Sequence, residues 1–291
     1  MNIDLSLQAY VVRLFRPLNR QRATGGFPIT GALSSALNAS ATVIPKPRAA
    51  YQVILQPDVA TMFLMAGVDS WMRAVHSFLV SAALTDVSPI WASVAGYYSS
   101  HYSVRAIAHV LGFFQLFSAK QIFQLELNGN QFLGTFNPKN GSDREHKFYW
   151  KVVKDNSLFV TDPFFTYNDS KRDPSDAGHR GRANYADFLQ DFPTFQPLDR
   201  QEVVRRIQKI SNIECSAPPI PSAANYPDVE SVQIVAYHRL VRFRDILDKI
   251  LGTGNTGNRF WNVHRDPPWA RDFIDYQLVD ARTNPGQLGP N

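Results

Sequence analysis

The sequence contains a single cysteine, Cys215, and this scarcity excludes several kinds of site. One thiol can neither close an internal disulfide nor supply the paired cysteines of a structural zinc site. The chain also lacks a run of about 18 uncharged apolar residues, which a transmembrane helix would need. Its first residues do not have the basic and then apolar order of a secretory signal. We therefore expect a cytoplasmic protein without a membrane partner.

Motifs of several enzyme classes are absent as well. The chain has no phosphate-binding P-loop, no Gly-x-Ser-x-Gly nucleophile elbow and no His-x3-His pair for a metal ion. The glycines of residues 252–257 match the dinucleotide-binding fingerprint only superficially, because they follow a predicted helix and no βαβ unit surrounds them. We expect neither a metal nor any other cofactor.

The chain does contain enough apolar sequence for a core, and it is rich in arginine. Of its 291 residues, 44% are hydrophobic and 19% are charged, which is typical of a globular protein. Arginine supplies 21 of the 30 basic residues. Because guanidinium groups bind phosphates in bidentate fashion, Arg239, Arg242 and Arg244 are candidates for a nucleic-acid interface. A solvated surface without a specific partner explains these arginines equally well.

Two long helices are predicted in the first half of the chain. Apolar residues recur at helical spacing from near residue 57 to residue 84, with a break at Gly67 left open, and again over residues 88–113. Ser88 is a suitable N-cap, and the proline after it fits the first helical position. Because the link between the helices is short, they should pack as an antiparallel pair.

The pattern then changes to that of strands. Residues 122–127 and 131–136 flank an Asn-Gly pair, which supplies the positive φ angles of a two-residue hairpin turn. Residues 146–153 and 158–161 are predicted as further strands of the same antiparallel sheet.

Helical patterns return in the second half. A polar loop is expected at residues 168–183, followed by helices at 185–192, 199–210 and 229–251. The order of helices, sheet and helices indicates an α+β protein.

The predicted domain organisation is a mainly helical bundle with an inserted small antiparallel β-sheet. We assign residues 1–50 to an irregular N-terminal arm and residues 283–291 to a flexible tail. The residues between them, 51–282, form a single domain with its β insertion at about 118–162.

The helix at residues 88–113 carries an unusual set of polar side chains beside a stripe of small residues. Arg105 and His109 are four residues apart and share one helix face, with Tyr102 close to them in the sequence. These side chains could form hydrogen bonds with one another inside a helix–helix seam, or they could line a cleft. The Tyr97–Ala106 segment resembles a helix of the HEPN superfamily of small helical domains.

A second resemblance to HEPN proteins lies in Asn258-Arg-Phe-Trp-Asn-Val-His264, where four residues separate Arg259 from His264. The Arg-x(4–6)-His motif of HEPN ribonucleases implies metal-independent RNA cleavage by a homodimer with a shared cleft. His264 would then transfer a proton at the 2′-hydroxyl or the leaving 5′-oxygen, and Arg259 would stabilise charge on the phosphate. The supporting positions would be Asn262, Tyr102, Arg105 and His109.

The sequence thus favours a metal-independent endoribonuclease, or a toxin-type effector of a prokaryotic defence system, with RNA as its partner. The alternative is a non-catalytic interaction or sensor subunit on the same helical fold, with a second copy or another protein as its partner. An arginine-rich nucleic-acid-binding protein is a third possibility. In a non-catalytic protein, Trp261 and Trp269 would pack a surface loop in which His264 makes only local hydrogen bonds.

Overall fold

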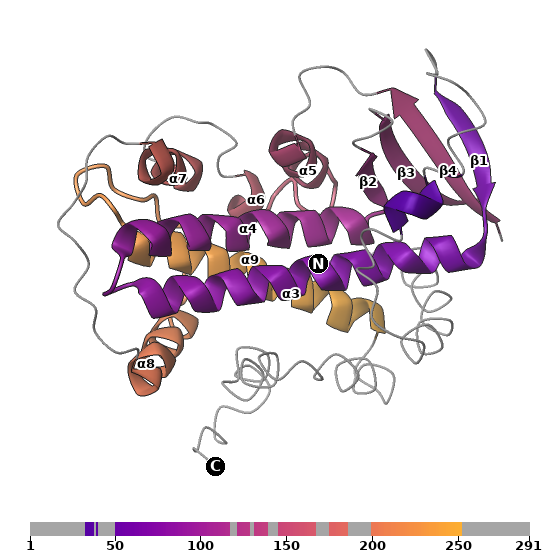
Figure 1. Ribbon diagram of the computed structural model, residues 1–291. Helices are drawn as coiled ribbons and strands as arrows, with labels where there is room; N and C mark the ends of the chain where they lie inside the picture. The colour runs from indigo at the N-terminus through magenta and orange to yellow at the C-terminus, as the bar shows by residue number, and fades with distance from the viewer. Residues whose placement is uncertain are drawn as a thin grey trace. The chain divides into compact units, whose positions relative to one another are not determined.

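The computed structural model describes residues 33–37, 39, 50–116, 121–128, 131–138, 145–166, 175–185 and 199–251 (Figure 1). Its labelled elements follow in chain order: β1 (Tyr51–Leu55), α3 (Pro57–Leu84), α4 (Pro89–Val110), β2 (Phe113–Leu116), β3 (Gln121–Asn128), β4 (Gln131–Pro138), α5 (Glu145–Lys154), α6 (Pro163–Thr166), α7 (Asp176–Tyr185), α8 (Arg200–Ser211) and α9 (Val229–Leu251).

These elements make a mixed fold of helices and one small antiparallel sheet. Among the described residues, those up to Trp71 and within Val104–Val160 belong to one compact unit, here unit 1. Those within Met72–Ser103 and Thr161–Asp248 belong to a second, unit 2. None of the described helices combines the length and the apolar character that crossing a bilayer requires.

The sheet of unit 1 is organised by a row of aromatic side chains that crosses all four strands. Its strand order is β1-β4-β3-β2, and every neighbouring pair is antiparallel (Figure 1). The strand register places Tyr51 opposite Phe136, Phe136 opposite Phe123, and Phe123 opposite Phe114. Ring centroids lie 4.9 Å apart for the Tyr51–Phe136 pair and 4.7 Å apart for Phe136–Phe123. Such cross-strand pairs stabilise a sheet and bury its apolar face.

The predicted hairpin is confirmed, but the sheet extends beyond the segment from which it was expected. Strands β3 and β4 pair from Gln121–Pro138 to Asn128–Gln131. The sheet also includes β2, and β1, which precedes the first long helix. At Gly134 an added Cβ would overlap the ring of Phe123, so this strand position requires the absence of a side chain.

Two sequence predictions are wrong in this region. Residues 146–153, predicted as a strand, belong to helix α5, and residues 158–161 form turns. In α5 the exposed Lys147 and Lys151 are one helical turn apart, while Tyr149 and Val153 are buried on another side. The aromatic composition suits a strand, but the burial follows the helical period.

The predicted polar loop at residues 168–183 is also partly helical, because α7 begins at Asp176. Ser175 caps this helix, since its Oγ accepts a hydrogen bond from the backbone N–H of Gly178 at 2.8 Å. Of the helix predicted at 185–192, only Tyr185 lies within the described residues, and it ends α7.

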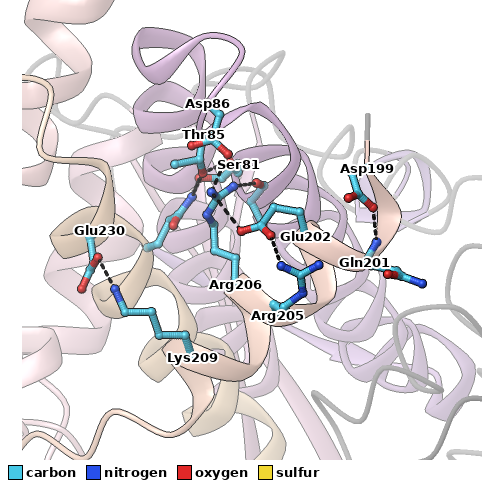
Figure 2. Close-up of polar contacts among 12 residues, drawn as sticks. Ser81, Thr85, Asp86, Asp199, Gln201, Glu202, Arg205, Arg206, Lys209 and Glu230 are labelled. Atoms are coloured by element: carbon cyan, nitrogen blue, oxygen red, sulfur yellow. Dashed lines mark hydrogen bonds and ion pairs between the residues drawn. The ribbon is translucent and has the colours of Figure 1, made fainter. Parts of the chain in front are cut away.

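The helices predicted at 88–113, 199–210 and 229–251 are confirmed as α4, α8 and α9. Helix α3 continues through Gly67 without a break. The fold of unit 2 depends on a buried polar contact among three of these helices. Gln233 of α9 donates to the hydroxyls of Ser81 at 3.0 Å and Thr85 at 2.8 Å, and Ser81 donates to the Ala92 carbonyl at 2.7 Å (Figure 2).

Charged side chains of helix α8 contact the end of α3 and the start of α9 (Figure 2). Its N-cap, Asp199, accepts from the backbone N–H two residues further on. Arg206 donates to a carbonyl near the end of α3 at 3.0 Å and to the carboxylate of Asp86 at 2.6 Å. Lys209 pairs with Glu230 of α9 at 2.8 Å. Exposed pairs of this kind contribute about 0–1 kcal/mol each, so they orient α8 more than they stabilise it.

The close approach of α4 to α9 at Gly96 gives a first prediction. A Cβ at residue 96 would lie 2.8 Å from Cγ1 of Val232 and 3.2 Å from Oγ of Ser81. Gly96→Ala should therefore lower the free energy of unfolding by about 1–3 kcal/mol, as overpacking does, although alanine is the better helix former. The measurement is urea denaturation followed by circular dichroism.

Two companion variants make this test specific. Val232→Ala in the Gly96→Ala background should make the combined loss smaller than the sum of the single losses, because the clashing methyl is gone. The matched control is Gly181→Ala in α7, where an added Cβ meets nothing within 4 Å, and this change should be neutral or stabilising. A stabilised Gly96→Ala variant would contradict the proposed packing.

Candidate functional site

The structure separates the predicted site residues into three groups. On α4 lie Tyr102, Arg105 and His109, and on α9 lie Arg239, Arg242 and Arg244. Outside the described residues lie Arg259, Asn262 and His264, whose roles stay predictions.

His109 is the centre of a closed polar contact in unit 1. Its side chain is fully buried. Nδ1 lies 3.0 Å from the carbonyl oxygen of Phe113, and because a carbonyl only accepts, Nδ1 carries the proton and donates it. Nε2 is then the acceptor for Nε of Arg105, at 3.2 Å.

Aromatic rings enclose this pair. The imidazole of His109 stacks on Phe114 at a centroid distance of 5.1 Å and meets Tyr149 edge to face at 5.3 Å. The guanidinium of Arg105 lies over the same Tyr149 ring, 5.5 Å from its centroid. Arg105 and His109 are thus held by residues that follow α4 in the chain, in β2 and α5.

The electrostatic environment keeps this imidazole neutral. Burial lowers the pKa of His109 to about 3, and the positive charge of Arg105 acts in the same direction. Both ring nitrogens are already engaged, so a neutral His109 has no free position for accepting or donating a proton. It fits a structural role better than general acid–base catalysis.

A pH dependence follows from the pKa of His109. Since the folded-state pKa lies below the unfolded value of about 6.5, the unfolded chain binds more protons between these values. Stability from this group is therefore complete above about pH 6.5 and falls as the pH falls, by about 2 kcal/mol on going from pH 7 to about pH 5.

The measurement compares the wild type with His109→Gln in urea at both pH values. The variant should be less stable near neutral pH, and its loss of stability on acidification should be smaller by about that same 2 kcal/mol. All other titrating groups are common to the two proteins and cancel in the comparison. Equal losses would show that His109 does not titrate as its burial requires.

The third predicted site residue of α4, Tyr102, belongs to unit 2. Tyr102 is partly exposed, and its ring lies 5.7 Å from that of His101 and 6.2 Å from that of Tyr98. Both contacts lie within α4 itself.

The arginines of α9 lie inside unit 2. Arg239 is fully buried; its Nε donates to the Phe164 carbonyl at 2.9 Å, and its Nη1 donates to Asp176 at 2.7 Å. Arg242 donates to Asp162 at 2.8 Å, and its guanidinium lies over the ring of Phe164. A guanidinium placed like that of Arg239 has no surface on which to receive a phosphate.

Arg244 is buried as well, with 8% of the residue exposed. The interface predicted for Arg239, Arg242 and Arg244 thus gains no support from their positions. Arg239 and Arg242 instead connect α9 to α6 and α7 within unit 2.

Sequence reasoning missed the acidic partners of these arginines, although a local signal was present. Asp162 and Asp176 both lie where a helix begins. Asp162 accepts from the Phe164 N–H at 3.0 Å, as a cap does. Asp176 accepts from the N–H of the next residue at 2.9 Å. Helix-start signals could have placed both carboxylates, but no sequence pattern pairs them with arginines more than 60 residues away.

The buried Arg239–Asp176 pair gives a third prediction. Both side chains are almost completely inaccessible, at 0% and 1% exposure. Asp176→Ala should cost about 3–5 kcal/mol of stability, because it leaves the Arg239 charge buried without its partner. Replacing both residues, as Asp176→Leu with Arg239→Met, should recover part of that loss.

The matched control is the exposed pair Arg205–Glu202, with side chains 64% and 43% exposed. Glu202→Ala should change stability by no more than about 1 kcal/mol. Thermal and urea unfolding report both results. A similarly small effect of Asp176→Ala would mean that the carboxylate is not an essential partner of Arg239.

The single cysteine does not present an activated nucleophile. Sγ of Cys215 lies 3.2 Å from Nε2 of His238, and the same nitrogen lies 3.2 Å from the Ile213 carbonyl. Because that carbonyl requires a donor, Nε2 carries a proton and cannot take one from the thiol. Burial raises the pKa of Cys215, which the positive Arg242 only partly opposes, so the thiol stays protonated at neutral pH.

No group of three or more His, Cys, Asp or Glu side chains suited to a metal ion occurs within the ranges that the structure covers. Comparison with protein-family models, with curated proteins and with solved structures gave no match to this chain.

Proposed function

We propose that the protein is a metal-independent endoribonuclease on a HEPN-like helical fold, with Arg259 and His264 as its reacting pair. The observation that carries the proposal is the spacing of this pair and its place in the chain, a few residues after the long helix α9 ends at Leu251.

The chemistry follows from the two side chains. Histidine titrates near neutral pH, so His264 can take the proton of an RNA 2′-hydroxyl or protonate the leaving 5′-oxygen. Arg259 stays charged and stabilises the negative charge that develops on the phosphate. Two copies of the chain would place two such pairs across a shared cleft.

The contacts of the described residues reduce the number of candidates for proton transfer. Arg105 and His109 hold each other in a buried contact, and the Cys215 thiol is protonated. We therefore assign proton transfer to His264 alone and give Arg105 and His109 a structural role. Activity in the cytoplasm, as a toxin-type effector of a prokaryotic defence system, is the biological role that such cleavage suits.

RNA cleavage without metal tests this assignment. The purified protein should cut single-stranded RNA in the presence of a chelator, and His264→Ala or Arg259→Ala should slow cleavage by about 10²–10⁴-fold, the usual contribution of a general acid or base. Matched controls are His76→Ala and Arg205→Ala, which change exposed residues of α3 and α8 and should keep the wild-type rate. Full activity in both motif variants, or cleavage that the chelator abolishes, would refute the assignment.

A non-catalytic interaction subunit is the second candidate, and one observation favours it. Trp91, in the first turn of α4, is 59% exposed, and tryptophan is among the most frequent anchors of protein interfaces. If α4 carries an interface, Trp91→Ala should weaken self-association by about 2 kcal/mol or more without changing the fold. Light scattering over a dilution series measures this, and an unchanged oligomeric state would argue against the interface.

A further inference from the structure

Helix α5 of unit 1 presents two exposed lysines on one side. Lys147 and Lys151 are both exposed and are four residues apart, so their side chains lie on the same face of the helix. Four residues of a helix rise by about 6 Å, which places the two charged side chains next to each other along the axis. Lys147 and Lys151 are called the lysine face below.

The other sides of α5 are fixed in the core of unit 1. Phe148, Tyr149 and Val153 are buried. The hydroxyl of Tyr149 accepts a hydrogen bond from the backbone N–H of Gln115 in β2 at 3.3 Å. These contacts hold the helix in one orientation, so the lysine face is presented to solvent from a rigid element.

The charge of the lysine face is not neutralised by the described part of the chain. No carboxylate among the described residues forms an ion pair with Lys147 or Lys151. The acidic residues nearest in the sequence are at the two ends of the helix: Glu145 is its first residue, and Asp155 follows its last. Two adjacent positive charges therefore remain in contact with water.

Exposed cations of α8 are paired, in contrast to the lysine face. Arg205 contacts the carboxylate of Glu202 at 2.6 Å, and Lys209 contacts that of Glu230 at 2.8 Å. Lys209 is thus a lysine of similar exposure whose charge is already compensated, and it provides the matched control for the lysine face.

We propose that the lysine face of α5 binds the phosphate backbone of single-stranded RNA. Lysine is a compact positive charge on a flexible stem, so it can pair with a phosphate without reading the base. Each phosphate that is neutralised releases counterions, and this release supplies affinity that does not depend on sequence. The choice of RNA rests on the proposed function. The inference adds a substrate-binding surface in unit 1 to the reacting pair Arg259 and His264.

An anionic lipid surface suits α5 less well than RNA does. A helix that lies on a membrane inserts an apolar face into the lipid, beside its basic face. The aromatic side chains of α5, at residues 148–150, are buried within the protein and are not available for insertion.

The salt dependence of RNA binding tests the lysine face. The full chain with His264→Ala is used so that the RNA is not cut, and binding of a fluorescein-labelled oligouridine of about 16 nucleotides is followed by fluorescence anisotropy. Sodium chloride is varied between about 50 and 200 mM. Lys147→Gln with Lys151→Gln should make the slope of log affinity against log salt shallower by about 1.4, because each phosphate contact on a single strand contributes about 0.7. Binding near 150 mM salt should weaken by about tenfold.

Two controls separate charge from other effects of substitution. Lys147→Arg with Lys151→Arg keeps both charges and should keep the slope of the parent protein. Lys209→Gln removes an exposed lysine that is paired with Glu230, and it should also leave the slope unchanged. Circular dichroism verifies that each variant is folded.

Three results would overturn the proposal. The first is an equal slope in the double glutamine variant and its parent, and the second is no binding of the oligouridine at all. The third is binding to phosphatidylglycerol vesicles that requires both lysines in a protein that does not bind RNA, which would assign the lysine face to a lipid surface.

Failure of this proposal is distinguishable from failure of the ribonuclease assignment. A wild-type chain that binds RNA through Lys147 and Lys151 but does not cut it would keep the lysine face and refute the reacting pair. Cleavage that requires His264, with a slope that does not depend on the two lysines, would give the opposite result.

Discussion

The contact on which unit 2 depends most is the buried ion pair between Arg239 and Asp176. Removing two charges from water is expensive, so such a pair is tolerated only when its geometry is good and its remaining donors are used. Arg239 meets part of this demand, because its Nε also donates to the carbonyl of Phe164. One side chain of α9 therefore connects to α6 through the backbone and to the first residue of α7 through a carboxylate. The buried polar residues of this unit therefore connect its helices to one another.

The same residue types that suggest a catalytic or nucleic-acid site in a sequence also build buried polar networks, and burial decides between the two. Arg105 and His109 have the four-residue spacing from which a shared face is predicted, and the structure brings them into contact. Their surroundings, however, come from later in the chain: the Phe113 carbonyl takes one ring nitrogen, and Tyr149 covers both side chains. With its pKa held at about 3, His109 serves as a neutral linker.

The parts of the fold that could be predicted are those with a long, regular period or a strong turn signal. Helix α9 and the hairpin of β3 and β4 belong to this class. Helix α5 was mistaken for a strand because Phe148, Tyr149 and Trp150 suit either structure, and only tertiary packing decides. Strand β1 has five residues, too few for a period, and α7 is too polar to show one. The partners of Arg239 could not be predicted at all, since they lie 63 and 75 residues away in sequence.

Asp176 shows how a tertiary contact replaces a local helix contact in unit 2. The four-residue spacing on α7 would allow this carboxylate to pair with Arg180, but in the folded chain it pairs with Arg239. The tertiary contact prevails because a fully buried Arg239 without a carboxylate would cost far more than a partly exposed Arg180 without one. The guanidinium of Arg180 lies instead over the ring of Tyr97, 4.9 Å from its centroid. A single acidic residue thus connects α7 to α9 rather than closing a contact within α7.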